Sequence, residues 1–118
     1  MALFYDLGAL LHKREQNPEA IDANLITFVE EANDVLLKVR KNIDKKNYEK
    51  VYKHILKLKG TVELLAMEEA MEEALVIVDW TKTEGKVKTI KEIFKSFDKR
   101  VKGAVKEVKK DFNIKEKV

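Results

Sequence analysis

The chain contains no cysteine, a single proline and only four glycines in 118 residues. Without cysteine it can form neither disulfides nor thiolate metal sites. So little proline and glycine leaves few residues for the many turns of a β-sandwich. No apolar run approaches the length of about 18 residues that a membrane span needs. These absences favour a helical domain that is stabilised by its own hydrophobic core.

Recognisable ligand patterns and targeting signals are also missing. The two histidines, His12 and His54, have no neighbouring ligand pattern, so we expect neither a metal nor a cofactor. The N-terminus lacks the basic, apolar and small-residue succession of a signal peptide, and the default expectation is a cytoplasmic protein. No repeat, low-complexity segment or second domain is marked, so we expect residues 1–118 to form one domain.

Charged residues make up 38% of the chain, and their signs are unevenly distributed. Residues 86–118 carry twelve lysines and arginines against five acids, whereas residues 61–85 carry seven acids against one lysine. We interpret this as a basic helix lying beside an acidic one. A basic helix that binds nucleic acid is the less favoured alternative, because aromatic stacking residues and glycine-rich loops are missing. We therefore expect no nucleic acid and no membrane among the partners.

Hydrophobic residues recur at intervals of three and four along the chain, which is the period of amphipathic α-helices. The pattern predicts an additional short helix over about residues 2–14, lying across one end of the domain. Four longer helices are predicted over about residues 18–44, 48–66, 68–80 and 87–113. Their short connections favour an all-α fold in which an antiparallel up-down four-helix bundle spans about residues 18–113.

Local signals place the helix boundaries and the core. Asn17-Pro18-Glu19 is typical of a helix start. Residues 81–85 form the clearest break between predicted helices, and we expect Gly85 to be the glycine that ends this break. The predicted inward positions of the helix over 48–66 are Val51, Ile55, Leu58, Val62 and Leu65. Those of the helix over 68–80 are Met71, Ala74, Leu75 and Val78, with Trp80 closing the end of the bundle.

Gly60 interrupts the helix over 48–66, where it should cost about 1 kcal/mol relative to alanine. A helix that keeps a glycine at such a place usually needs something to approach its backbone closely. The residues around Gly60 therefore carry the question of function.

Residues 47–67 resemble the central helix of the histidine-containing phosphotransfer (HPt) domain, the shuttle module of two-component phosphorelays. The signature of that family is a histidine, any residue, then Leu-Lys-Gly and a small residue. Leu58-Lys59-Gly60-Thr61 matches the second half of the signature, and Leu56 stands where the histidine belongs. The order and spacing of all four helices extend the resemblance over about residues 21–112. It implies an HPt-like bundle whose phosphoacceptor position lies on the outer face.

His54 offers an alternative phosphoacceptor, because His54-Ile55-Leu56-Lys57 also reads histidine, any residue, Leu-Lys. That register would place Leu58 where the glycine is wanted and Glu49 in the core. Residues two positions apart in a helix are rotated by about 200° around its axis, so His54 and Leu56 point to nearly opposite sides. We therefore predict that Leu56 is exposed and that His54 lies at the edge of the core.

The resemblance implies a phosphotransfer relative that has lost its phosphoacceptor and is not an enzyme. It would bind a response-regulator receiver domain or a histidine kinase through Tyr52, Lys53, Leu56, Lys59, Gly60 and Glu63. Two alternatives stay open, namely an active phosphoryl carrier that uses His54 and a structural bundle unrelated to signalling. The resemblance leaves the oligomeric state open, with a monomer favoured.

Overall fold

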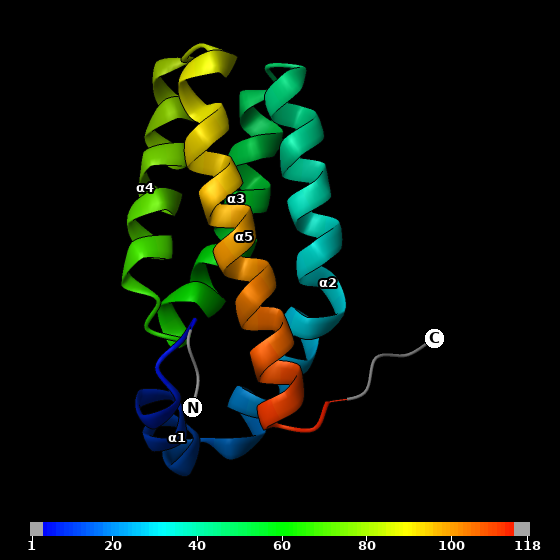
Figure 1. Cartoon of the computed structure of the whole chain (residues 1–118), viewed down its shortest axis with the longest axis vertical. Coiled ribbons are helices and arrows are strands. Elements are labelled where there is room, and N and C mark those ends of the chain that lie inside the picture. The colour runs from blue at the N-terminus through cyan, green and yellow to red at the C-terminus, as the bar shows by residue number, and fades with distance from the viewer. Residues whose placement is uncertain (1–3, 115–118) are drawn as a thin grey trace.

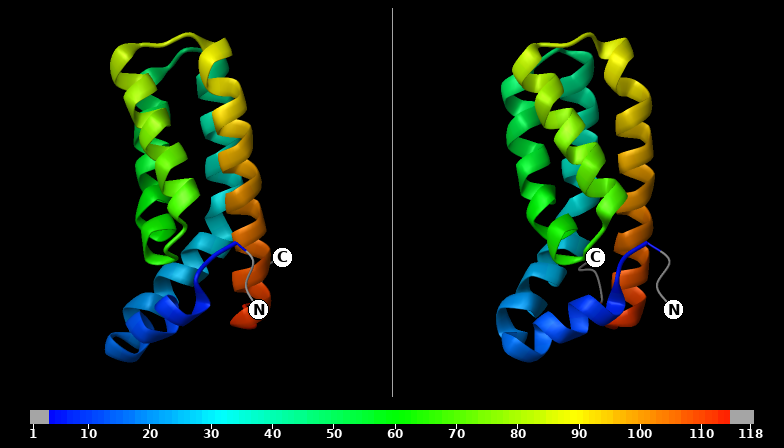
Figure 2. Two further views of the ribbon diagram at one scale, coloured as in Figure 1. Left: turned by 60° about the vertical axis from the view of Figure 1, so that its left-hand side comes forward. Right: turned by 90° about the vertical axis from the view of Figure 1, so that its left-hand side faces the viewer.

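The computed structural model of the chain describes residues 4–114, which form five α-helices and no strands (Figure 1). The helices are α1 (Leu7–Gln16), α2 (Pro18–Asp44), α3 (Tyr48–Leu64), α4 (Glu68–Thr83) and α5 (Val87–Asp111). The all-α prediction is confirmed. Helices α2 to α5 lie side by side along their lengths, and α1 lies at one end of this bundle (Figures 1 and 2). No helix in the described range is long and apolar enough to cross a membrane.

Four helices form a ring around one core. Helix α3 contacts α2 and α4, while α5 contacts α4 and α2. Short turns at residues 45–47, 65–67 and 84–86 reverse the chain between consecutive helices (Figure 1). On the flank between α4 and α5, Arg100 lies 2.5 Å from a carboxylate oxygen of Glu69 and 3.1 Å from one of Glu73. The predicted packing of a basic helix against an acidic one is thereby confirmed.

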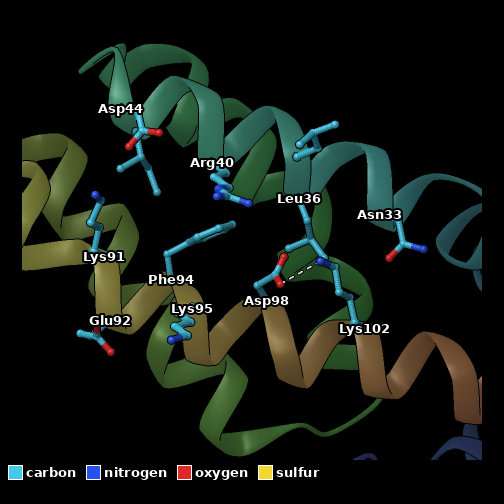
Figure 3. Close-up of a pocket in the computed structure, with 12 residues that line it drawn as sticks. Asn33, Leu36, Arg40, Asp44, Lys91, Glu92, Phe94, Lys95, Asp98 and Lys102 are labelled. Atoms are coloured by element: carbon cyan, nitrogen blue, oxygen red, sulfur yellow. Dashed lines mark ion pairs between the residues drawn. The ribbon is translucent and has the colours of Figure 1, made fainter.

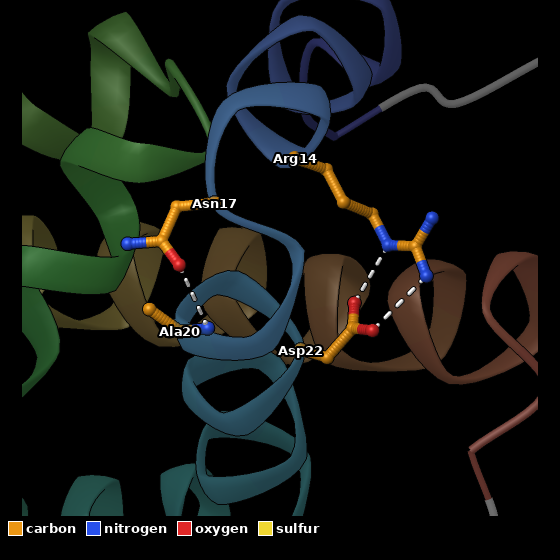
Figure 4. A network of polar contacts seen from close by, with 4 residues as sticks. All are labelled: Arg14, Asn17, Ala20 and Asp22. Atoms are coloured by element: carbon orange, nitrogen blue, oxygen red, sulfur yellow. Dashed lines mark hydrogen bonds and ion pairs between the residues drawn. The ribbon is translucent and has the colours of Figure 1, made fainter.

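The start of α2 follows the signal read in the sequence (Figure 4). The Asn17 side chain accepts a hydrogen bond of 3.4 Å from the Ala20 amide, and proline occupies the first turn. Arg14 donates two hydrogen bonds to the Asp22 carboxylate, at 2.7 and 3.0 Å. The guanidinium lowers the pKa of Asp22. This pair ties α1 to the first turns of α2.

The N-terminal helix is displaced from its predicted position. It begins at Leu7 rather than near residue 2, because the Asp6 side chain caps it by accepting a 3.0 Å hydrogen bond from the Ala9 amide. Residues 2 and 3 of the predicted helix lie outside the described range. The segment before α1 crosses the end of the bundle, where the Tyr5 hydroxyl donates to Asp111 at 2.7 Å and the Asp6 amide donates to the Leu65 carbonyl at 3.0 Å.

Helix α4 differs from its prediction in length and in phase. It continues to Thr83, three residues beyond the expected end. The expected inward position of Leu75 is wrong, since this side chain is 52% exposed. Because four apolar residues follow one another at positions 75–78, the sequence allows more than one inward phase. The buried residues of α4 are Ala70, Ala74, Ile77, Trp80 and Thr81.

The turn after α4 does not use its glycine as expected. Glu84, not Gly85, takes the left-handed conformation that ends the helix, with φ at 52°. Gly85 instead makes room for Trp80, because a Cβ atom there would lie 2.4 Å from Cδ1 of the indole. The Trp80 Nε1 atom donates to the Lys86 carbonyl at 2.9 Å. The role predicted for Trp80, closing the end of the bundle, is confirmed.

Candidate functional site

Helix α3 presents a buried face and an exposed face. Asn47 starts the helix by accepting a 3.2 Å hydrogen bond from the Lys50 amide. The five predicted core residues, Val51, Ile55, Leu58, Val62 and Leu65, are all buried. The predicted docking residues lie away from this core: Lys53, Gly60 and Glu63 are exposed, Lys59 is half-buried, and Tyr52 and Leu56 are 38% and 42% exposed.

The flank of α3 that carries His54 faces α2. On this flank the Thr61 hydroxyl donates a 2.6 Å hydrogen bond to the Asn24 side chain of α2. The Nδ1 atom of His54 is buried and has no hydrogen-bond partner within residues 4–114. Burial lowers the pKa of His54, and the positive charges of nearby lysines lower it further, in the order Lys57, Lys38, Lys53 and Lys50. His54 is therefore a neutral, half-buried imidazole at neutral pH.

Leu56 lies on the other flank. Two helical positions separate it from His54, which corresponds to a rotation of about 200°. Since the His54 flank faces α2, Leu56 points toward the outer side that α3 shares with α4. The structure thus agrees with the predicted orientation of these two side chains. Lys59, about one turn further along on the same side as Leu56, forms no ion pair with residues 4–114.

Gly60 has no steric reason within the described chain to be glycine. A Cβ atom built on it would meet no atom within 4 Å. The helical Gly103 of α5 differs, because a Cβ there would lie 2.6 Å from the ring of Phe4. Gly103 thus makes room for the Phe4 ring, whereas the space above Gly60 is open.

The outer face of α3 carries side chains of several chemical kinds. It offers an aliphatic side chain, a phenol, an ammonium group and a carboxylate, but no nucleophile held by a base. The nearest imidazole, His54, is on the wrong flank. No group of three or more potential His, Asp or Glu metal ligands occurs in the described part of the chain.

A separate hollow of about 420 Å³ lies between α2 and α5 (Figure 3). The buried side chains Leu36, Ile43 and Phe94 contribute to its lining, and an ion pair of 3.0 Å between Asp98 and Lys102 lies at its edge. In the ring of helices this hollow is on the side opposite α3 and α4, and none of the predicted site residues lines it. No sequence pattern predicted this hollow, because its walls come from two helices far apart in the chain.

Comparison with known proteins finds no matching family model, no matching curated protein and no matching solved structure. The candidate site is therefore defined by the sequence pattern of α3 and by the geometry of its outer face.

Proposed function

We propose that this protein is an HPt-like module that binds a receiver domain or a histidine kinase without carrying phosphate. In this proposal α2 to α5 are the antiparallel up-down bundle of that family, and α1 is an addition. Docking takes place on the outer face of α3, through Tyr52, Lys53, Leu56, Lys59, Gly60 and Glu63.

The observation that carries the proposal is the outward orientation of Leu56. In the HPt pattern this position holds the histidine that meets an incoming phosphoryl group. Here the position is on the surface, but its side chain has no atom that could accept phosphate. Lys59 and Gly60, which would accompany the histidine, remain on the same side of the helix. The surface of a docking module is thus retained around a residue that is chemically inert.

The geometry favours this account over an active carrier that uses His54. In-line attack on a phosphoryl group requires an imidazole nitrogen that is open to solvent and close to a cation that steadies the phosphate. His54 has lysines nearby, among them Lys57, but it is half-buried against α2 with its Nδ1 atom enclosed.

A purely structural bundle is the other alternative. It would give no reason for Gly60, which weakens α3 without accommodating any neighbouring atom of the described chain. A docking partner that approaches the helix backbone supplies that reason. The exposed Leu56 beside it provides the apolar contact that such a partner would bury.

Binding to a panel of receiver domains from the source genome tests the proposal. We expect one or more to bind, and the Leu56→Asp variant to lose at least about tenfold in affinity because a contact at the centre of the interface becomes charged. Its stability should change by about 0.5 kcal/mol or less, since the site is exposed. Leu11→Asp is the matched control, because Leu11 of α1 is also 42% exposed but lies outside the docking face. If neither a receiver domain nor a histidine kinase of the source genome binds, or if both variants bind equally well, the docking account is wrong.

A further inference from the structure

The outer face shared by α3 and α4 has a leucine at its centre on each helix. Leu56 points away from α2, as shown above. On α4, Glu69 and Glu73 face Arg100 of α5, so Leu75, about 200° from Glu73, points away from α5. Both leucines therefore lie on the same outer side of the bundle, where α3 and α4 run next to each other (Figure 2).

The two leucines also lie at about the same height. The chain reverses at residues 65–67, which places residues at equal distances from this turn side by side. Near the other end of the pair, the rings of Tyr48 and Trp80 are 4.9 Å apart, which fixes the same alignment to within about one helical turn. Leu56 is nine residues before the first residue of the turn, and Leu75 is eight after its last.

Charged residues above and below the leucines alternate in a matching order. From the Tyr48 end, the outer side of α3 carries Glu49, Lys53, Lys59 and Glu63, and at the same heights α4 carries Lys82, Asp79, Glu72 and Glu68. At the first three heights the α3 and α4 residues have opposite charges, and only at the last height are both residues acidic. None of these eight side chains forms an ion pair within residues 4–114.

We propose that this face binds the same face of a second copy of the chain. A twofold axis parallel to the helices places α3 of one copy opposite α4 of the other and preserves the height of every residue. Leu56 then packs on Leu75 of the second copy. Glu49 meets Lys82, Lys53 meets Asp79, and Lys59 meets Glu72, each twice by symmetry. Gly60 lies near the height of Glu72 and lets the second copy come close to the α3 backbone.

We assign a second copy of the chain as the binding partner of this face because the chain itself supplies the complementary surface. The order of charges on α3 is matched by α4 at three of four heights, and the apolar centres coincide. The acid pair Glu63 and Glu68 is the single mismatch, and it lies at the edge near the turn. This assigns binding roles to five residues for which the sequence pattern predicted none, namely Glu49, Glu72, Leu75, Asp79 and Lys82.

The size of the face is that of a small interface. Helices of 17 and 16 residues are about 25 Å long, and two of them side by side are about 20 Å wide, which gives about 500 Å² in projection. A stable interface buries about 800 Å² per partner, so we expect this smaller face to give a weak, reversible dimer, with a dissociation constant on the order of 1 μM to 1 mM. The proposed dimer differs from the monomer that the sequence favoured.

Dimerisation would bury Leu56, so dimerisation and receiver binding would exclude each other. This consequence rests on the proposed function, whereas the dimer does not. A protein at low concentration would expose its docking face, and the same protein at high concentration would cover it.

Analytical ultracentrifugation over about 1 μM to 1 mM, the range that brackets this affinity, tests the dimer. Lys59→Glu and Glu72→Lys should each raise the dissociation constant at least about tenfold, because each places like charges together at two symmetric positions. The double variant exchanges the two charges and should return to within about threefold of the parent. Circular dichroism checks that each variant is folded. A chain that is monomeric at the highest concentration, or a double variant that is not restored, would overturn the proposal.

Leu75→Asp separates the dimer from the proposed function, because Leu75 is not among the proposed docking residues. This variant should be monomeric over the whole range, and a dimer that survives it overturns the interface. Receiver binding is then measured on the monomeric variant. An absence of receiver binding there counts against the proposed function and leaves the dimer standing.

Discussion

Leu56 and His54 are two residues apart, yet they point to opposite flanks of α3, and the proposed function depends on which of them faces solvent. The imidazole is held against α2 with its Nδ1 atom buried, while the leucine stands on the outer side beside Lys59. A phosphoryl group that arrived at this outer face would meet a methyl group instead of a nitrogen. The proposal that this protein docks without carrying phosphate follows from the leucine at this one position.

His54 should make the stability of the fold sensitive to mild acid. Burial and the charges of Lys57, Lys38, Lys53 and Lys50 lower its pKa in the folded protein, so the unfolded chain takes up this proton at a higher pH. The contribution to stability is therefore fully present above the ordinary imidazole pKa of about 6.5 and is lost as the pH falls below it.

Chemical denaturation at pH 7 and pH 5 measures this effect. The parent protein should lose more stability between the two values than His54→Gln does. The exposed His12→Gln is the control and should behave like the parent. An equal loss in the parent and His54→Gln would show that the imidazole is not desolvated.

Gly85 is held at its position by the indole of Trp80, and Gly85→Ala should expose this constraint. A Cβ at residue 85 would lie 2.4 Å from Cδ1 of the ring, so the ring must shift and its hydrogen bond to the Lys86 carbonyl is weakened. We expect a loss of about 1–3 kcal/mol in the free energy of unfolding, the usual cost of overpacking. Gly8→Ala is the control, because its Cβ would have only an ordinary contact of 3.5 Å with Asp6. Equal stabilities for the two variants would contradict the packing described here.

Among the helices, α2, α3 and α5 could be predicted closely from the sequence, whereas α1 and α4 could not. A single apolar stripe fixes the phase of α3, and all five of its predicted core residues are buried. In α4 the run at residues 75–78 fits several phases, and small residues such as Ala70 and Ala74 decide the outcome by packing. The end of α4 was missed because a glutamate, not a glycine, takes the left-handed conformation.

Helix α3 retains Gly60 at a cost to its own stability, which makes the glycine a test of docking at the level of the element. Gly60→Ala should raise the free energy of unfolding by about 0.5–1 kcal/mol, because the added Cβ meets nothing and the helix gains propensity. The same variant should bind receiver domains and the second copy less tightly. Gly103→Ala is the helical control and should be destabilising, since Phe4 occupies the space. A Gly60→Ala variant with unchanged binding would mean that nothing approaches the helix there.

At the scale of the whole molecule, the ring of four helices decides which surfaces can act together. The sequence could place Leu56 on the outside of α3, but it could not show that Leu75 lies beside it, because this depends on which flank of each helix meets its neighbours. The contacts of Thr61 with Asn24 and of Arg100 with Glu69 settle that arrangement. The exposure of the proposed docking residues of α3 was thus predictable, whereas the proposed two-helix face depends on the packing of the bundle.

An NMR titration of the isotope-labelled protein with phosphorylated receiver domains tests the central claim most directly, because it reports docking and phosphoryl transfer together. The account predicts that the amide signals of Leu56, Lys59, Gly60 and Glu63 shift on adding a cognate receiver domain, while the imidazole signals of His54 show no phosphorylation. Acid-labile phosphate on His54 would contradict it and reveal an active carrier. Unchanged spectra with every receiver domain and kinase of the source genome would contradict it as well, and would leave a structural bundle.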